Sequence, residues 1–300
     1  MEQAGLSQCI GDLGCFKNNR AIISTHVDDM LACGLNEELN KIEQAIKQKV
    51  ELDKLGLPTK LLGLELSWAN DKKTVKLTQT NAIERLVKEH GITNEVPTRS
   101  FPLQPESYEV EGKKLQPAQA TKYQSLVRSL LYINRCTRPN ISIHIDLLGS
   151  RTSDASHRNL QTTLQLLRYL ASTKTEGIPL TQNTTERIIA YADTLYGREG
   201  AKSQSGNLLT LNGNIIMCSS RKQDVIAQLI TEAKYIACSE GAKDTRWLQQ
   251  FLNEIEPERE VLLYTDNEAA IRLTKSQTFY RRGRETLPPR GAPWELPLEC

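Results

Sequence analysis

The feature that most constrains this chain is a change of hydrophobic period after residue 180. Three short strand-like runs follow one another there, RIIAYAD, SGNLLTLNG and NIIMCSS. A helical pattern then extends from Thr231 to Ile255, followed by the strand-like VLLYTD and the helical NEAAIRLTK. Three strands, a helix, a strand and a helix in this order predict a compact α/β unit.

The first 93 residues predict a different arrangement, two hairpins that are each followed by a helix. The first hairpin covers 21–34 and turns at Asp28-Asp29, and the second joins LLGLELSW to TVKLTQ through a polar turn at 69–72. Asn36 is the expected cap of the first helix, and the second helix is expected over 79–90.

The chain is therefore expected to mix α+β and α/β architecture, in five parts. These are two hairpins with their helices (1–93), a proline-bearing linker (94–118), a helical connection (119–180), the α/β unit (181–276) and a disordered Arg/Pro tail (277–300). The helical connection is predicted to contain three helices, roughly over 119–133, 139–150 and 155–172.

Composition narrows the class of protein. The net charge of +2 gives no global attraction to nucleic acid, and the seven cysteines include no CxxC pair, which argues against a disulfide framework or a zinc site. The first residues lack the pattern of a secretion signal, and no apolar run has the ~18 residues of a membrane span. We expect an intracellular protein of the cytoplasm or nucleus with no membrane partner.

Three acids of the α/β unit stand at positions that would converge on one sheet edge. Asp193 is expected to end the first strand, Asp266 to end the strand LLYTD, and Glu232 to lie in the first turn of the intervening helix. Three converging carboxylates can hold two divalent cations about 3.5–4 Å apart for phosphoryl chemistry. The alternative is that Glu232 only favours a helix N-terminus and the aspartates are ordinary strand ends.

Asp28 and Asp29 form a second acidic group. Aspartates are common in hairpin turns, where they face water. Paired carboxylates flanked by apolar strands also suit Mg²⁺, so both interpretations stay open.

The motifs resemble those of copia-type retrotransposon polyproteins. HVDDM resembles the Asp-Asp box of reverse transcriptases, with His26 in place of a tyrosine, and LLGLELSWANDKKTVKLTQ resembles the hairpin that grips the primer end. VRSLLYINRCTRPNISIHI and SDASHRNLQTTLQLLRYLAST are similar to the segments that follow in that family. AYAD, SQSGNLL, SSRKQDV, TEAKYIA, RWL and TDNEAAI are similar, in the same order, to its ribonuclease H module.

The resemblance implies a partial reverse transcriptase palm and thumb followed by a ribonuclease H-like mixed sheet. It places polymerase metal ligands at Asp28 and Asp29 and ribonuclease H ligands at Asp193, Glu232 and Asp266, with two Mg²⁺ or Mn²⁺ ions at each working site. It implies an RNA–DNA hybrid or DNA as partner, contacted by Gly63, Trp68, Lys72, Lys73, Arg221 and Lys222. The sequence gives no oligomeric state.

Several departures from the family pattern put activity in doubt. We expect the chain to lack the upstream acid and the fingers of a polymerase. We also expect it to lack the last acid and the histidine of ribonuclease H, because the Arg/Pro tail occupies their place. Leu229-Ile230 replaces a serine pair, and Lys234 replaces an acid two positions after Glu232, where a basic side chain would repel metals unless it faces solvent.

Two functions remain open. The first expectation is a truncated reverse transcriptase/ribonuclease H piece that acts on hybrids by two-metal phosphoryl transfer, with polymerase activity lost. The alternative is a catalytically inactive relic that retains at most nucleic-acid binding.

Overall fold

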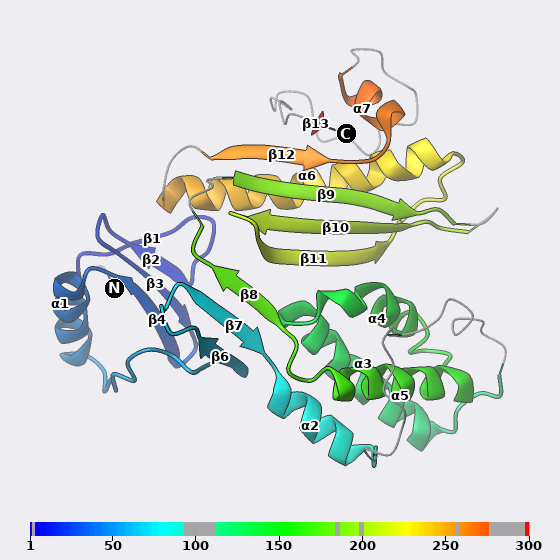
Figure 1. The fold of residues 1–300 in the computed structure, drawn as a ribbon, viewed down its shortest axis with the longest axis horizontal. Coiled ribbons are helices and arrows are strands. Elements are labelled where there is room, and N and C mark those ends of the chain that lie inside the picture. The colour runs from blue at the N-terminus through cyan, green and yellow to red at the C-terminus, as the bar shows by residue number, and fades with distance from the viewer. Residues whose placement is uncertain are drawn as a thin grey trace.

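A computed structural model describes residues 1, 4–92, 102, 112–183, 187–197, 201–255, 259–275 and 298–299. The chain forms three β-sheets and a group of helices, so the predicted mixed α/β class is confirmed (Figure 1). Most of the predicted linker and of the predicted disordered tail lies outside the described residues.

The first sheet is antiparallel and has the order β1-β2-β3-β4. Its strands are β1 (Ser7–Gln8), β2 (Cys15–Lys17), β3 (Ala21–His26) and β4 (Asp29–Gly34), and α1 (Asn36–Lys47) follows. Ile23 and Ile42 pack in a small core between sheet and helix. The prediction that Asn36 caps α1 is wrong: Asn36 is the first helical residue, and Leu35 precedes it without a side-chain cap. The acids of the first turn, Glu37 and Glu38, are instead placed to favour the helix dipole.

The second sheet contains a strand that the sequence did not predict. β5 (Lys60–Leu61), β6 (Leu64–Trp68) and β7 (Thr74–Thr78) form the expected hairpin region, and α2 (Thr80–Glu89) follows. β8 (Ile178–Thr181) pairs antiparallel with β7 at the sheet edge, where Pro179 removes no hydrogen bond from an inner strand. The predicted helical connection therefore ends in a strand, because its partner lies about a hundred residues away in the chain.

The helical group holds the largest of the three apolar cores. It contains α3 (Pro117–Cys136), the 3₁₀ turn η3 (Pro139–Ile141), α4 (Ser142–Gly149) and α5 (His157–Ser172). Pro117 occupies the first turn of α3, where its missing N–H costs nothing. Ser156 caps α5 by accepting a hydrogen bond from the backbone N–H of Asn159. Arg138 is buried, and its guanidinium donates to the carbonyl and the hydroxyl of Thr173 at 2.9 and 2.8 Å.

The third sheet has the order β11-β10-β9-β12-β13 and carries the predicted acids. Its members are β9 (Arg187–Leu195), β10 (Gln204–Leu211), β11 (Asn214–Lys222), β12 (Glu260–Tyr264) and β13 (Leu298–Glu299), with helices α6 (Ile230–Ile255) and α7 (Glu268–Lys275). β9, β10 and β11 are antiparallel, whereas β12 runs parallel to β9.

One face of the third sheet is covered by α6, which runs along the strands in Figure 1. Ile188, Ala190 and Ala192 alternate along β9 and pack with Leu209 and Cys238 in the core beneath the helix. The residues between them point to the opposite face. Two residues of the predicted tail, 298–299, form β13 beside β12, because the outer edge of β12 offers unpaired backbone groups.

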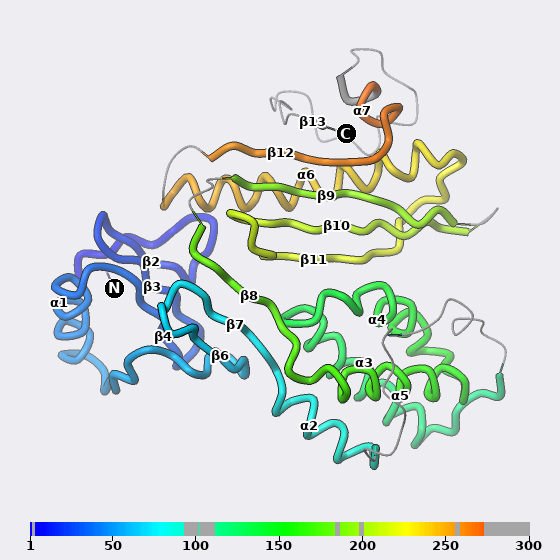
Figure 2. Tube along the Cα trace, viewed as in Figure 1, coloured from blue at the N-terminus to red at the C-terminus, as the bar shows by residue number. Residues whose placement is uncertain are grey.

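Polar contacts join the sheets, whose succession along the chain Figure 2 traces. The backbone N–H groups of Ile10 and Gly11 donate to the two carboxylate oxygens of Glu254, each at 2.7 Å, which fixes the β1–β2 loop against the end of α6. The side chain of Asn214 in turn accepts from the N–H of Thr181 and donates to its carbonyl, so β8 is held to the β10–β11 turn. Within the described ranges, no helix combines the length and the apolar character needed to cross a membrane.

Candidate functional site

Two of the predicted acids meet at one edge of the third sheet. β9 and β12 are parallel and in register at Tyr191 and Tyr264. Asp193 lies two residues further along β9, and Asp266 lies two residues beyond the end of β12. Asp193 does not end its strand as predicted, because β9 continues to Leu195. The side chains of Asp193 and Asp266 are 73% and 65% exposed.

A lysine ammonium lies between these two carboxylates. Lys234 Nζ lies 3.3 Å from Asp193 Oδ1 and donates a short hydrogen bond to Asp266 Oδ1. The lysine side chain is only 13% exposed, so it does not face solvent. Burial alone lowers the pKa of Lys234, but the hydrogen bonds and the charges of Asp266 and Asp193 outweigh it, and the pKa is raised. The ammonium therefore stays charged.

Glu232 lies in the first turn of α6, as predicted, and has a partner of its own. Its Oε2 accepts a hydrogen bond of 2.8 Å from the backbone N–H of Gln228. The carboxylate thereby satisfies an amide in the chain that leads into the helix.

The arrangement does not fit the pair of divalent cations that the resemblance implies. Two of the three carboxylates are ion-paired with an ammonium, and the third accepts from a backbone amide. Among the residues that the structure describes, no group of three His, Cys, Asp or Glu side chains could hold a metal ion. A fixed positive charge at the shared position opposes a further cation.

An aromatic pair beside the acids was missed from the sequence. The rings of Tyr191 and Tyr264 stack with centroids 5.5 Å apart and planes at 19°, and Tyr191 is 45% exposed. Each tyrosine stands two residues before one of the two aspartates, and the two tyrosines pair with each other in the register of β9 and β12. The recurrence of Tyr-Ala-Asp and Tyr-Thr-Asp at two strand ends is the signal that could have found them.

The predicted basic pair Arg221-Lys222 lies at the same end of the sheet as Asp193. Across the antiparallel ladder, Gly206 pairs with both Asp193 and Ser220, and the next positions of β11 are the two basic residues. Because neighbouring strands are about 4.8 Å apart, β11 lies roughly 10 Å from β9. Arg221 also lowers the pKa of Asp244, although burial raises it overall.

The other predicted nucleic-acid contacts lie elsewhere. Lys73 O accepts from the N–H of Gln182, and the neighbouring Thr181 binds Asn214, which places Lys72 and Lys73 at the sheet end opposite Asp193. Gly63 adopts a positive φ of 76° in the β5–β6 turn, and the indole of Trp68 donates to Pro58 O at 2.8 Å. Among these residues the structure does not form one continuous basic surface.

The predicted polymerase acids belong to the first sheet. Asp28 lies in the β3–β4 turn after Val27, whose φ is 54°, and Asp29 begins β4 opposite His26. Both aspartates are exposed. The two acidic groups of the chain are therefore on different sheets.

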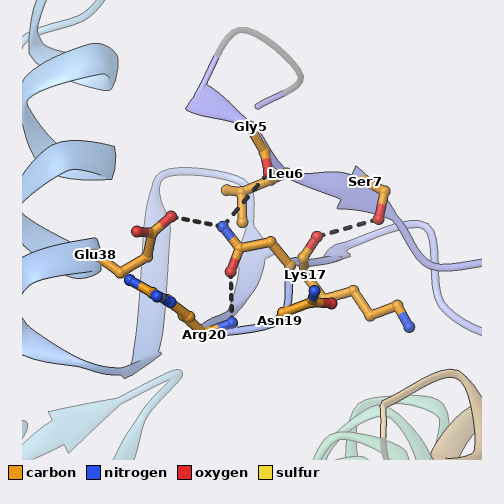
Figure 3. Close-up of a pocket in the computed structure, with 8 residues that line it drawn as sticks. Gly5, Leu6, Ser7, Lys17, Asn19, Arg20 and Glu38 are labelled. Carbon is orange, nitrogen blue, oxygen red and sulfur yellow. Dashed lines mark hydrogen bonds between the residues drawn. The ribbon is translucent and has the colours of Figure 1, made fainter.

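A wide, open hollow of about 630 Å³ lies beside the first sheet, away from both acidic groups (Figure 3). Asn18 spans it, since its Nδ2 donates to Glu38 Oε1 at 2.8 Å and its Oδ1 accepts from the N–H of Arg20 at 2.8 Å. Ser7 Oγ donates to Lys17 O across the adjoining strands. These contacts join the β2–β3 turn to α1.

Comparison with known proteins identifies the relatives of the chain. No protein-family model matches it. It is 28% identical over 282 residues, 89% of its length, to the retrovirus-related Pol polyprotein from transposon TNT 1-94 of Nicotiana tabacum. It is also 34% identical over 128 residues to the secreted RxLR effector protein 161 of Plasmopara viticola, covering 42% of this chain and 90% of that protein.

Among solved structures, a foamy viral protease-reverse transcriptase in complex with dsDNA aligns with a TM-score of 0.48 and 12% identity, over 92% of this chain and 54% of that one. The chain spans only 21% of the tobacco polyprotein. Retrotransposon Pol polyproteins of plants and yeast are therefore the homologues that match about 90% of this chain.

Proposed function

We propose that this chain is a reverse transcriptase/ribonuclease H segment of a retrotransposon Pol polyprotein that binds RNA–DNA hybrids on its third sheet without cleaving them. The observation that carries the proposal is the ammonium of Lys234 between Asp193 and Asp266. It neutralises part of an acidic edge that would otherwise repel phosphates, and it opposes the two cations that cleavage needs.

The face that carries the acids also offers groups suited to a nucleic acid. The stacked Tyr191 and Tyr264 present an aromatic surface on which a base or sugar can pack, and Lys222 supplies a charge for a backbone phosphate at the same sheet end. Recognition through stacking and backbone contacts is independent of base sequence, as expected for a hybrid held by its shape and 2′-hydroxyls.

The test is binding of a labelled RNA–DNA hybrid, a DNA duplex and an RNA duplex of one sequence to the full chain, over a series of salt concentrations. We expect the hybrid to bind most tightly. Tyr191→Ala is expected to weaken hybrid binding by about tenfold or more, as loss of a stacking contact does. Trp247→Ala is the matched control, because Trp247 is 46% exposed and stacks on Phe251, on α6. Equal affinities for the three duplexes, or equal effects of the two substitutions, would contradict the proposal.

The alternative is that the chain cleaves hybrids by two-metal phosphoryl transfer through Asp193, Glu232 and Asp266. The closeness of Asp193 and Asp266, which both contact the ammonium of Lys234, favours it. The test is Mg²⁺-dependent cleavage of the hybrid by the wild-type chain and by Asp193→Asn. Cleavage that the substitution abolishes would establish this alternative and contradict the proposal that the site does not cleave.

A further inference from the structure

We infer that Lys234 is the built-in counter-ion of Asp193 and Asp266 and that it excludes divalent cations from this acid pair in the wild-type chain. The inference rests on the part of the proposed function that denies metal-dependent cleavage. It concerns the free protein, so it is independent of nucleic-acid binding.

The contacts of Lys234 are those of a bound cation. One nitrogen contacts an oxygen of each aspartate; Asp193 is on β9, and Asp266 lies two residues beyond the end of the neighbouring parallel strand β12. Their oxygens are therefore close enough to share a single positive ion. Mg²⁺ would need to approach the same oxygens to about 2.0–2.1 Å, a position that the ammonium blocks by volume and by charge.

The backbone next to Lys234 is tied to the third sheet. Ala233, the preceding residue, is fully buried, and its carbonyl accepts a hydrogen bond of 2.9 Å from Gln223 Nε2. The same amide group of the buried Gln223 donates to Ser205 Oγ on β10 at 3.0 Å. The start of α6 is thus tied to the sheet, and Lys234 projects from it toward the strand ends.

The charges around the site also favour an internal ion pair. Lys234 is 13% exposed, whereas its two partners are mostly exposed, and its ammonium contacts both aspartates. The carboxylate of Glu232 accepts a hydrogen bond from the N–H of Gln228, so its stabilisation does not depend on Lys234. Removal of the ammonium would leave the two neighbouring carboxylates without their shared partner, an arrangement that attracts a divalent cation.

The experiment measures Mn²⁺ binding to the full chain by the loss of the free-ion signal in electron paramagnetic resonance, with Mg²⁺ as competitor and no nucleic acid present. The variants are Lys234→Ala, Lys234→Met, Lys234→Arg, and Lys234→Ala combined with Asp193→Asn. Lys243→Ala is the matched control, because Lys243 is an exposed lysine of the same helix. Circular dichroism establishes that each variant is folded.

We expect Lys234→Ala and Lys234→Met to bind Mn²⁺ at least tenfold more tightly than the wild-type chain, and Asp193→Asn to abolish the gain. Lys234→Arg and Lys243→Ala should behave as the wild type does. Equal binding by the wild type and both neutral variants overturns the inference, and so does a gain that Asp193→Asn leaves intact. If the chain does not bind the hybrid but the Mn²⁺ result is as expected, the proposed function is contradicted and the inference about Lys234 stands.

Discussion

The ammonium of Lys234 lies 3.3 Å from the carboxylate of Asp193, on a different secondary-structure element, and it also binds Asp266. The relationship joins α6 to two strands of the third sheet. It therefore has a consequence for stability as well as for the chemistry of the site.

Removing either end of the Lys234–Asp266 pair should lower the free energy of unfolding, and the two losses should not add. We expect a coupling energy of about 1 kcal/mol from a double-mutant cycle of Lys234→Met and Asp266→Asn, because the carboxylates are largely exposed. Urea denaturation measures it, and the coupling should shrink at 1 M salt. Strict additivity of the two substitutions would show that the pair contributes nothing.

Burial of His144 makes the stability of the helical group depend on pH. Burial lowers its pKa from 6.5 to about 4, so the unfolded chain takes up a proton at a higher pH than the folded chain does. The contribution of His144 to the free energy of unfolding is fully present above about pH 6.5. It is lost as the pH falls through 4, and the total loss is on the order of 3 kcal/mol.

The measurement for His144 is urea denaturation of the wild type and of His144→Gln between pH 4 and 7. The substitution should remove this part of the acid sensitivity. Asp146, whose pKa is raised by burial, contributes with the opposite sign in both proteins, so the difference between the two curves isolates His144. Parallel curves would contradict the assignment.

Arg138 should be one of the most sensitive positions of the helical group. Its guanidinium is 2% exposed, donates twice to Thr173 and lies over the ring of Tyr169. Arg138→Met is expected to cost about 3 kcal/mol, because the lost hydrogen bonds leave buried acceptors unsatisfied. Arg135→Met, at an exposed position of α3, is the control and should change stability by less than about 0.5 kcal/mol. Similar losses from both variants would refute the special role of Arg138.

The cysteines should differ sharply in reactivity. Burial, assisted by the neighbouring Cys9, raises the pKa of Cys15 to about 12, whereas Cys33 is exposed. Because the thiolate is the reactive form, iodoacetamide at pH 8 should label Cys33 first among the cysteines that the structure describes, and Cys15 only after denaturation. Peptide mass spectrometry measures the order, and Cys33→Ser should remove the fast phase. Labelling of Cys15 at the rate of Cys33 in the folded protein would show that the first sheet opens readily.

The helices and strands with strong local signals could be predicted from the sequence. The alternation of RIIAYAD predicted β9, and the helical spacing after Thr231 predicted α6. These signals are local because strand and helix periods arise from neighbouring residues.

Strand pairing and contacts between distant side chains became visible in the three-dimensional structure. β8 exists because β7 offers it an edge, and the tyrosine pair forms because β9 and β12 are parallel and in register. The sequence showed a lysine where an acid was expected, but it left open whether that lysine would face solvent. Packing of α6 against the sheet directed it to Asp193 and Asp266, since burial and ion pairing depend on groups that are distant in the chain.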